Sequence, residues 1–441
     1  MAALHKGTSV PPFLTEMRAI ASLIPWETNA RTHSPHQIDQ IAASIEEFGF
    51  TNPVLIDEQG SILAGHGRVA AAKQLGLTEV PCVRIEHMSE AQKRAYVIAD
   101  NQLALNAGWD IELLSEELSF LSSDEIDFDL DLTGFSLAEV DDIILSAHPE
   151  ETENPEDDIL PTDEGLREVK PGEIYQLGSH RLICGNALDP HIVSTLMDGE
   201  KATMVFTDPP YNVPIDGHVC GKGSVKHNEF AMAAGEMNEA QFTQFLTEAF
   251  QQLVEHTVPG SIHFICIDWR HLGEMLNAGR STYTELKNLI TWVKDNGGMG
   301  TFYRSRHELI FAFKNGDAPH INNFELGQHG RYRTNVWQYR GVNSIGSSRM
   351  EELRLHPTVK PVQMIADAIL DVSGRGDIIL DTFGGSGSTL IAAQKTGRRA
   401  RLVEIDPLYC ARIIKRYEAF AHDRAVLLGT VNEASQLEEA S

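Results

Sequence analysis

A glycine-rich turn that follows an apolar run constrains the fold of this chain most. Ile378-Ile379-Leu380 reads as a buried strand, and the turn Asp381-Thr382-Phe383-Gly384-Gly385-Ser386-Gly387 comes directly after it. Leu390–Thr396 then predicts a helix that ends at Gly397, and Ala400–Ile405 predicts another strand. This order predicts a nucleotide-binding β-α-β unit, in which glycines let the ligand approach the backbone and Glu404, about 20 residues further on, binds ribose hydroxyls.

The turn departs from the dinucleotide-binding pattern, because Leu390 occupies the position of the third glycine. An aromatic residue in the turn, Phe383, suits adenosine with an amino-acid tail better than it suits a pyrophosphate. A plain tight turn with no ligand is the alternative interpretation of this stretch.

A second motif, Thr207-Asp208-Pro209-Pro210-Tyr211, follows the apolar run Met204–Phe206, where a strand would end. The two prolines stiffen the loop and leave carbonyl groups free to accept hydrogen bonds. One carboxylate, fixed carbonyls and one aromatic ring suit a flat group with an exocyclic amine. Such a ring would stack on Tyr211 while its NH2 group is bound by Asp208 and the Pro209 carbonyl. An ordinary strand-to-turn junction is the alternative.

Together the two motifs resemble the amino-group DNA methyltransferases, which use S-adenosylmethionine. The tetrad precedes the glycine turn, and His356–Pro361 lies between them, an order similar to the circularly permuted β group of that family. The resemblance covers about residues 166–430 and implies catalytic roles for Asp208, Pro209, Pro210 and Tyr211. It implies that the cofactor is bound by Asp381, Phe383, Gly384, Gly385, Gly387 and Glu404, with Thr358 and Lys360 near its methionine end. Asn186 stands where the family usually has Asp near the adenine, so either Asn186 or Asp189 is expected there.

Residues 13–109 predict a separate small α/β domain. Ser34–Gln37 and Ser89–Gln92 are capping boxes, and Gly65-His66-Gly67-Arg68 opens a helix with a cationic side chain beside free N–H groups. The run resembles the ParB-like N-terminal domain, whose Gly-x-x-Arg loop binds phosphate groups in some members. Nucleotide binding, nuclease activity and a structural or DNA-docking role all stay open, and the last is favoured.

Residues 110–165 carry most of the acidity of the chain. The net charge is -27, and this segment holds 20 Asp or Glu and no Lys or Arg, which leaves about -7 for the remainder. Leucines and isoleucines at helical spacing predict short amphipathic helices, and the composition after Ala147 predicts a flexible linker. Affinity for DNA must therefore come from local basic patches.

A basic patch is predicted between residues 287 and 340. This stretch contains eight Lys or Arg but only four acidic residues, and its basic residues are interleaved with Tyr303, Tyr332, Trp337 and Tyr339. Basic groups with aromatics suit phosphate contact and base stacking, and the family's target-recognition region lies here in the β order. A solvated charged surface is the alternative. The expected DNA-binding residues are Lys294, Arg304, Arg306, Arg331, Arg333 and Arg340.

Other features limit the class of protein. No apolar stretch is long enough to span a bilayer, and residues 1–12 lack the core of a signal peptide. The five cysteines are scattered without a CxxC pair, so reduced thiols, a cytoplasmic location and no metal site are expected. Residues 431–441 read as a disordered tail.

The sequence thus predicts a small ParB-like α/β domain followed by a doubly wound α/β domain with a mostly parallel sheet. The resemblance implies a site-specific methyltransferase acting on a flipped base of double-stranded DNA, with adenine N6 preferred over cytosine N4. A ParB-like DNA-binding or nuclease protein is the alternative from another class, and an RNA or small-molecule amine methyltransferase also stays open. The oligomeric state is open, with a homodimer as one option, as is the existence of a partner restriction nuclease.

Overall fold

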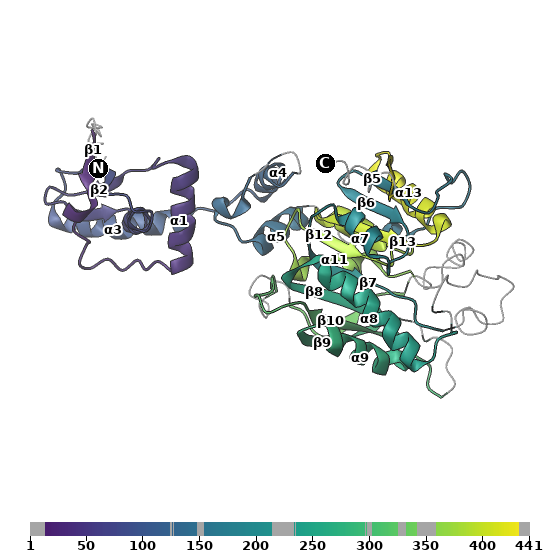
Figure 1. Ribbon diagram of the computed structural model, residues 1–441. Coiled ribbons are helices and arrows are strands. Elements are labelled where there is room, and N and C mark those ends of the chain that lie inside the picture. The colour runs from purple at the N-terminus through teal and green to yellow at the C-terminus, as the bar shows by residue number, and fades with distance from the viewer. Residues whose placement is uncertain are drawn as a thin grey trace, which may run out of the picture. The chain divides into compact units, whose positions relative to one another are not determined.

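The computed structural model describes residues 14–123, 126, 128–147, 154–213, 233, 235–295, 297, 302–324, 332–341 and 359–431. The chain divides into two compact units (Figure 1): Met1–Leu114 with Asp129–Ser136, and Ser115–Phe128 with Leu137–Ser441. The predicted tail lies outside the described residues from residue 432 onward. None of the helices in the described ranges is long and apolar enough to cross a membrane.

The N-terminal unit is built on a four-stranded sheet with the order β1-β4-β2-β3, in which β2 and β4 are parallel. The first strand, β1, was not predicted from the sequence. The capping box at Ser89 is confirmed, but at Ser34 only the serine caps, because the Gln37 side chain bonds to His33 instead. The elements are β1 (Thr15–Ala19), α1 (Pro35–Phe48), β2 (Val54–Ile56), β3 (Ile62–Ala64), α2 (His66–Gln74), β4 (Glu79–Arg84) and α3 (Glu90–Leu105).

The acidic segment contains α4 (Ile111–Leu121), α5 (Leu137–Ala147) and short 3-10 helices at Leu130–Thr133 and Pro155–Asp158. Its predicted amphipathic helices are present. Residues 154–164 lie in the stretch predicted as a flexible linker, but in the structure they are hydrogen-bonded to the rest of the second unit. Asp163, for example, accepts two bonds of 2.7 Å from Arg412.

The second unit contains one ten-stranded sheet with the order β11-β9-β10-β8-β7-β12-β13-β6-β5-β14. The five central strands from β8 to β6 are mutually parallel, and antiparallel strands flank them. This confirms the predicted doubly wound, mostly parallel sheet. The strands are β5 (Glu173–Leu177), β6 (His180–Cys184), β7 (Ala202–Thr207), β8 (Thr257–Ile267), β9 (Glu285–Val293), β10 (His307–Lys314), β11 (Val336–Gln338), β12 (Ile378–Asp381), β13 (Arg399–Glu404) and β14 (Val426–Thr430).

Helices cover both faces of this sheet (Figure 1). Alternate strand residues serve the two faces: Met204 and Phe206 of β7 join one hydrophobic cluster, while Val205 joins the other. The cluster around Val205 includes α7 (Pro190–Met197), α8 (Glu239–Glu255) and α9 (Leu272–Thr282). The cluster around Phe206 includes α11 (Val362–Val372), α12 (Ser388–Thr396) and α13 (Pro407–Ala421).

The chain leaves β7 and β12 in opposite directions. These neighbours are parallel, with Val205 opposite Leu380, but β7 continues through α8 to β8 and β12 continues through α12 to β13. Because the two connections diverge, a crevice is expected outside the carboxyl ends of β7 and β12. The tetrad follows β7 and the glycine turn follows β12, so the topology brings together two motifs that are far apart in the sequence.

Candidate active site

The tetrad at the end of β7 is part of a hydrogen-bonded ion-pair cluster. The Tyr211 hydroxyl donates to Asp208 Oδ1 at 2.5 Å, and Lys360 Nζ donates to Asp208 Oδ2 at 2.6 Å. Lys360 Nζ also lies 3.1 Å from the Tyr211 hydroxyl and 5.4 Å from the centre of its ring. The lysine side chain is only 6% exposed, so its charge is balanced inside the protein.

Two residues with no predicted catalytic role complete this cluster. Glu308, at the start of β10, accepts from the Tyr211 hydroxyl at 3.2 Å and pairs with Lys360 at 3.1 Å. Lys294, just after β9, pairs with Glu308 and lies 4.5 Å from the centre of the Trp292 ring. The only signal for Glu308 in the sequence is an acidic residue at the start of an apolar strand. We call Asp208, Tyr211, Lys294, Glu308 and Lys360 the Asp208 cluster.

Burial and charge act against each other in the Asp208 cluster. Burial raises the pKa of Asp208 above its usual range, although Lys360 opposes that shift. Burial by itself would raise the pKa of Glu308 too, but Lys360 and Lys294 hold it down at about 2. The pKa of Lys360 is raised because both carboxylates outweigh its own burial. Glu308 and Lys360 are thus a permanent ion pair, and Asp208 is the member whose charge is least stabilised.

Asp381 joins the tetrad to the glycine turn. It is buried at the end of β12 and accepts from the Thr207 hydroxyl at 2.8 Å, the Thr389 hydroxyl at 2.7 Å and the Phe383 N–H at 3.1 Å. Burial raises its pKa to about 6. Asp381 was expected to contact the cofactor. In the structure its hydrogen bonds tie the end of β7 to the turn and to the first residues of α12.

The glycine turn leaves room for a ligand beside an acidic group. Glu404, at the end of β13, is nearly buried and accepts from the Gly385 N–H at 2.7 Å and the Asp406 N–H at 2.9 Å. Burial raises its pKa to about 7. A Cβ on Gly385 would meet only the Phe383 carbonyl, at 3.8 Å, so the outer side of the turn is open. Because a carboxylate can accept more than these two bonds, Glu404 can also bind ribose hydroxyls at this open side.

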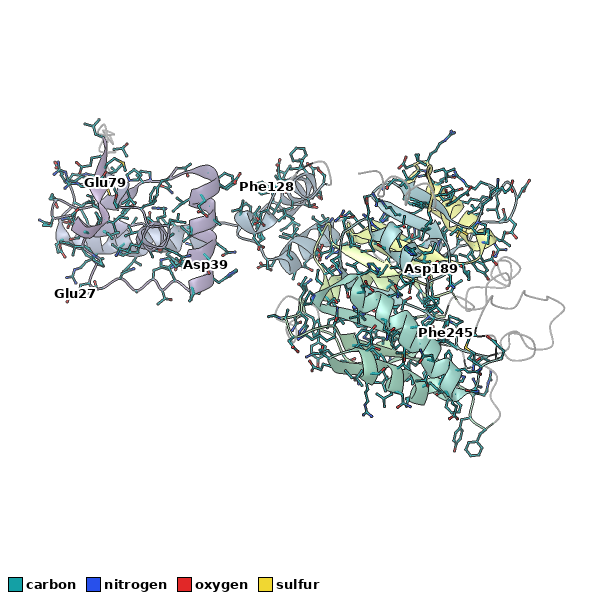
Figure 2. The ribbon with its side chains drawn as sticks, viewed as in Figure 1. Glu27, Asp39, Glu79, Phe128, Asp189 and Phe245 are labelled. Carbon is teal, nitrogen blue, oxygen red and sulfur yellow. The ribbon has the colours of Figure 1, made fainter. Side chains whose placement is uncertain are left out.

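The remaining predicted cofactor residues lie in three different settings. Phe383 packs near Phe245 of α8, with ring centres 6.2 Å apart (Phe245 is labelled in Figure 2). Asn186 follows β6, but its side-chain oxygen accepts from the Leu188 N–H within its own turn. Asp189, the proposed substitute, instead caps α7 by accepting from the His191 N–H (Figure 2). Thr358 lies outside the described residues.

The predicted DNA-binding residues separate into two groups. Lys294 belongs to the Asp208 cluster, and Arg333 donates to Asp371 at 2.8 Å and to the Tyr339 hydroxyl at 2.9 Å, so both cations already have partners within the protein. Arg304, Arg306 and Arg340 are exposed, while Arg331 lies outside the described residues. Much of the expected recognition region is sheet, because β9, β10 and β11 lie within it.

In the N-terminal unit, Gly65 starts α2 in a left-handed conformation with φ of 103°. Arg68 Nη2 donates to the Pro53 carbonyl at 3.4 Å, while its buried Nε has no hydrogen-bond partner among the described residues. Burial lowers the pKa of Arg68. A half-buried guanidinium whose buried Nε has no partner among the described residues, at a helix N-terminus, suits an anionic group.

These features define an α/β methyltransferase dependent on S-adenosylmethionine: a doubly wound sheet, a glycine turn beside Glu404, and an Asp-Pro-Pro-Tyr loop at the switch point. Three family models match the chain in order. The ParB N-terminal domain model matches residues 15–102, the ParB-methyltransferase HTH domain model matches residues 112–169, and the DNA methylase model of the N6/N4 family matches residues 202–416.

Known proteins match the two ends of the chain separately. The ParB-like nuclease domain-containing protein YnaK of Escherichia coli is 49% identical over 77 residues, which are 18% of this chain and 88% of that protein. The type II methyltransferase M2.MboI of Moraxella bovis is 28% identical over 47% of this chain and 76% of that protein. The DNA adenine methyltransferase YhdJ of E. coli is 26% identical over 53% of this chain and 82% of that protein. The crystal structure of the M1.HpyAVI-SAM complex has 17% identity and a TM-score of 0.38, and the match covers 54% of this chain and 98% of that one.

The chain therefore belongs to the ParB-like domain proteins through its N-terminal unit, and it joins that domain to a DNA methyltransferase domain of the N6/N4 family.

Proposed function

We propose that this protein is a site-specific methyltransferase that acts on adenine N6 in double-stranded DNA. The observation that carries the proposal is the position of Asp208–Tyr211 at the end of β7, tied through Asp381 to the glycine turn that follows β12. A flat base bound at the tetrad would lie next to a cofactor bound at the turn. The target must leave the duplex to reach this loop, so the reaction requires base flipping.

In this reaction the protein makes the exocyclic amine of the base more nucleophilic. The exocyclic nitrogen is a poor nucleophile, because its lone pair is delocalised into the ring. Asp208 and the Pro209 carbonyl accept its two hydrogens, which favours a pyramidal nitrogen with a localised lone pair. Bound S-adenosylmethionine supplies an electrophilic methyl group. The proton that the amine loses on methylation would pass to Asp208, whose raised pKa suits a proton acceptor.

The rest of the Asp208 cluster holds these groups in place. Asp208 and Glu308 both accept from the Tyr211 hydroxyl, which orients the ring on which the base stacks. Burial raises the pKa of Asp208, and Lys360 opposes that rise by stabilising the ionised carboxylate. Each Asp208 oxygen has a second lone pair, so the carboxylate can accept from the amine while it still contacts Tyr211 and Lys360.

Adenine is preferred over cytosine because the tetrad begins with Asp. In the family that the tetrad resembles, members acting on cytosine N4 more often have Ser at this position. YhdJ, a relative with 26% identity, is named a DNA adenine methyltransferase. The same chemistry applies to cytosine N4, which is the alternative product.

The surface next to β9 and β10 supports DNA as the substrate. Phe302 and Tyr303 are 87% and 82% exposed, and their rings lie 4.5 Å apart. Arg304 and Arg306 follow directly and are exposed. Since β10 starts at the same edge of the sheet as Asp208, these residues would contact phosphates and bases around the flipped target.

The test is transfer of labelled methyl from S-adenosylmethionine to unmethylated DNA, followed by mass spectrometry of the nucleosides. Wild type should yield N6-methyladenine, and Asp208→Ala should lower the rate about 10²–10⁴-fold, as expected for loss of a positioned acid-base group. Asp317→Ala is the matched control, because it removes an exposed carboxylate just beyond the end of β10. N4-methylcytosine would overturn the base assignment. Transfer to RNA but not to any DNA would overturn the substrate.

We further propose that the N-terminal unit binds a phosphate-bearing ligand at Gly65–Arg68. The unpaired buried Nε of Arg68 supports this second function. Cleavage of DNA is not favoured, because among the described residues no group of three or more His, Cys, Asp or Glu could hold a metal ion. Magnesium-dependent cleavage by the purified protein would revive the nuclease alternative.

A further inference from the structure

Several acidic residues between 137 and 164, among them Asp141, Asp157 and Asp158, contact the methyltransferase domain instead of lying free in solvent. α5 is anchored by Asp141, which is buried and accepts from Arg398 at 2.9 and 2.7 Å and pairs with Arg375 at 3.2 Å. Arg398 comes directly before β13, the strand that ends at Glu404. A buried two-bond contact of this kind is costly to break, because it would leave a charge unpaired.

Residues 154–164 continue these contacts along α12 and α13. Asp157 pairs with Lys395, and Lys415 donates to the Thr162 carbonyl at 2.9 Å. Leu160 is buried. We call Leu137–Ala147 and residues 154–164 the brace.

One brace residue caps the helix that follows Lys360. α11 begins at Val362 after Pro361, which provides no side-chain cap, and the Val362 N–H instead donates to Asp158 Oδ1 at 2.8 Å. The bond spans 204 residues of chain. Because Lys360 lies two residues before Val362, the start of α11 sets where Lys360 meets Asp208 and Glu308.

A second contact links the brace to the glycine turn. Arg416 of α13 is buried and donates through Nη1 to the Ser386 carbonyl at 2.8 Å and through Nη2 to the Asp157 carbonyl at 2.6 Å. The planar guanidinium therefore bridges a turn carbonyl and a brace carbonyl. Through Asp158 and Arg416 the brace reaches both halves of the site.

Charge argues against DNA as the partner of this segment, although residues 112–169 match a helix-turn-helix model. No Lys or Arg occurs between Asp110 and Glu164, and 20 acids do. Such a segment would be repelled by phosphates. In α5, the buried residues are Ala138, Val140, Asp141 and Ile144, so one face of the helix is already covered.

We propose that the brace is a positioning element of the methyltransferase site, in which Asp158 places Lys360 through the first turn of α11. This inference deepens the proposed function and rests on it for its kinetic consequences. The placement of Lys360 itself can be measured without methyl transfer.

The test compares Asp158→Ala, Asp158→Asn and Asp163→Ala in the full chain. Asn retains an oxygen that accepts from the Val362 N–H, whereas Ala does not. Asp163→Ala breaks a two-bond contact with Arg412 in the same brace but does not touch α11. Each protein is treated with an amine-acetylating reagent, and peptide mass spectrometry gives the labelling of Lys360 relative to the exposed Lys170.

Labelling of Lys360 should rise several-fold in Asp158→Ala and stay at the wild-type value in the other two variants. Lys360 labelling that is unchanged in a folded Asp158→Ala, or equally raised in Asp163→Ala, would overturn the proposal. If Asp158→Ala does not fold, Arg416→Lys serves instead, since one ammonium group cannot bridge both carbonyls as the guanidinium does. That variant should bind S-adenosylmethionine several-fold more weakly, and unchanged binding would overturn the contact with the turn.

Kinetics then connect the brace to the reaction. A displaced Lys360 no longer lowers the pKa of Asp208, so the acid limb of the methylation rate should move to higher pH in Asp158→Ala only. If Asp158→Ala lowers the melting temperature but leaves the acid limb of the pH–rate profile at its wild-type position, the role of Asp158 is purely structural and the proposal is overturned. If the wild-type protein transfers no methyl group but Lys360 labelling changes as expected in the variants, the proposed function is wrong and the positioning role of the brace is retained.

Discussion

The turns at Gly65 and Gly387 have similar backbone conformations but differ in the charged side chain that lies beside them. Gly65 directly follows β3, and Gly387 ends the turn that follows β12. Each glycine has a left-handed conformation and precedes a nine-residue helix. Their φ/ψ values are 103°/23° and 79°/19°. At both sites glycine is needed because a side chain rarely adopts these angles.

The neighbouring side chain separates the two turns chemically. Beside Gly385 lies Glu404, an acceptor for hydroxyl groups, whereas beside Gly65 lies Arg68, a donor whose Nε is unpaired. The guanidinium nitrogens of Arg68 lie 3.0 and 3.2 Å from where a Cβ on Gly65 would be. The charged residue beside each turn would thus favour ribose hydroxyls at Glu404 and an anion at Arg68.

Among the changes that test this comparison, removal of the Glu404 carboxylate should have the largest effect. Glu404→Ala should weaken S-adenosylmethionine binding about 10–100-fold in calorimetry, because hydrogen bonds to a charged group contribute about 1.5–3 kcal/mol. Arg68→Met should leave that affinity unchanged and abolish sulfate binding to the N-terminal unit. Loss of S-adenosylmethionine binding in Arg68→Met would contradict the assignment of separate ligands.

Substituting the glycines should sharpen the comparison. Gly387→Ala brings a Cβ within 3.1 Å of Ile413, and Gly65→Ala brings one within 3.0 Å of the Arg68 guanidinium, so each adds a close contact to backbone strain. Each should cost about 1–3 kcal/mol of stability in its own unit. In calorimetric melting with either ligand, Gly387→Ala should lose part of the stabilisation by S-adenosylmethionine and Gly65→Ala part of that by sulfate. If Gly387→Ala instead lost stabilisation by sulfate and Gly65→Ala lost stabilisation by S-adenosylmethionine, the two ligands would have been assigned to the wrong turns.

The smallest effect is a difference in pH dependence. Since burial raises the pKa of Glu404 to about 7, S-adenosylmethionine binding should weaken as the pH falls through 7, by at most about tenfold per pH unit for one group. The unliganded fold responds oppositely, because a carboxyl with a raised folded pKa favours folding as the pH falls from about 7 toward 4.5.

Titration calorimetry between pH 6 and 8 measures this dependence. Glu404→Gln should flatten the curve for S-adenosylmethionine. Sulfate binding at Gly65 should be nearly constant, because neither sulfate nor arginine titrates in this range. A Glu404→Gln curve as steep as that of wild type would assign the proton to another group.

Features that depend on neighbouring residues could be predicted from the sequence. The cap at Ser89, the strand before the tetrad, and the strand-turn-helix after Ile378 are present as expected. These features are local, because a cap or a turn is decided by backbone angles and bonds within a few residues. The order of the motifs was then enough to predict the doubly wound sheet and the family.

Only the tertiary structure decided which distant charges meet. Lys294 and Arg333 were expected to contact DNA, yet one pairs with Glu308 and the other with Asp371, 38 residues away in the sequence. Glu308 lies 97 residues from Tyr211, so no local pattern links them. Asp158 lies in the segment predicted as a flexible linker, but the fold gives it a specific partner in the Val362 N–H at the start of α11. A charged residue looks the same in a sequence whether it is solvated or paired, and the difference arises only when the fold removes water and supplies the opposite charge.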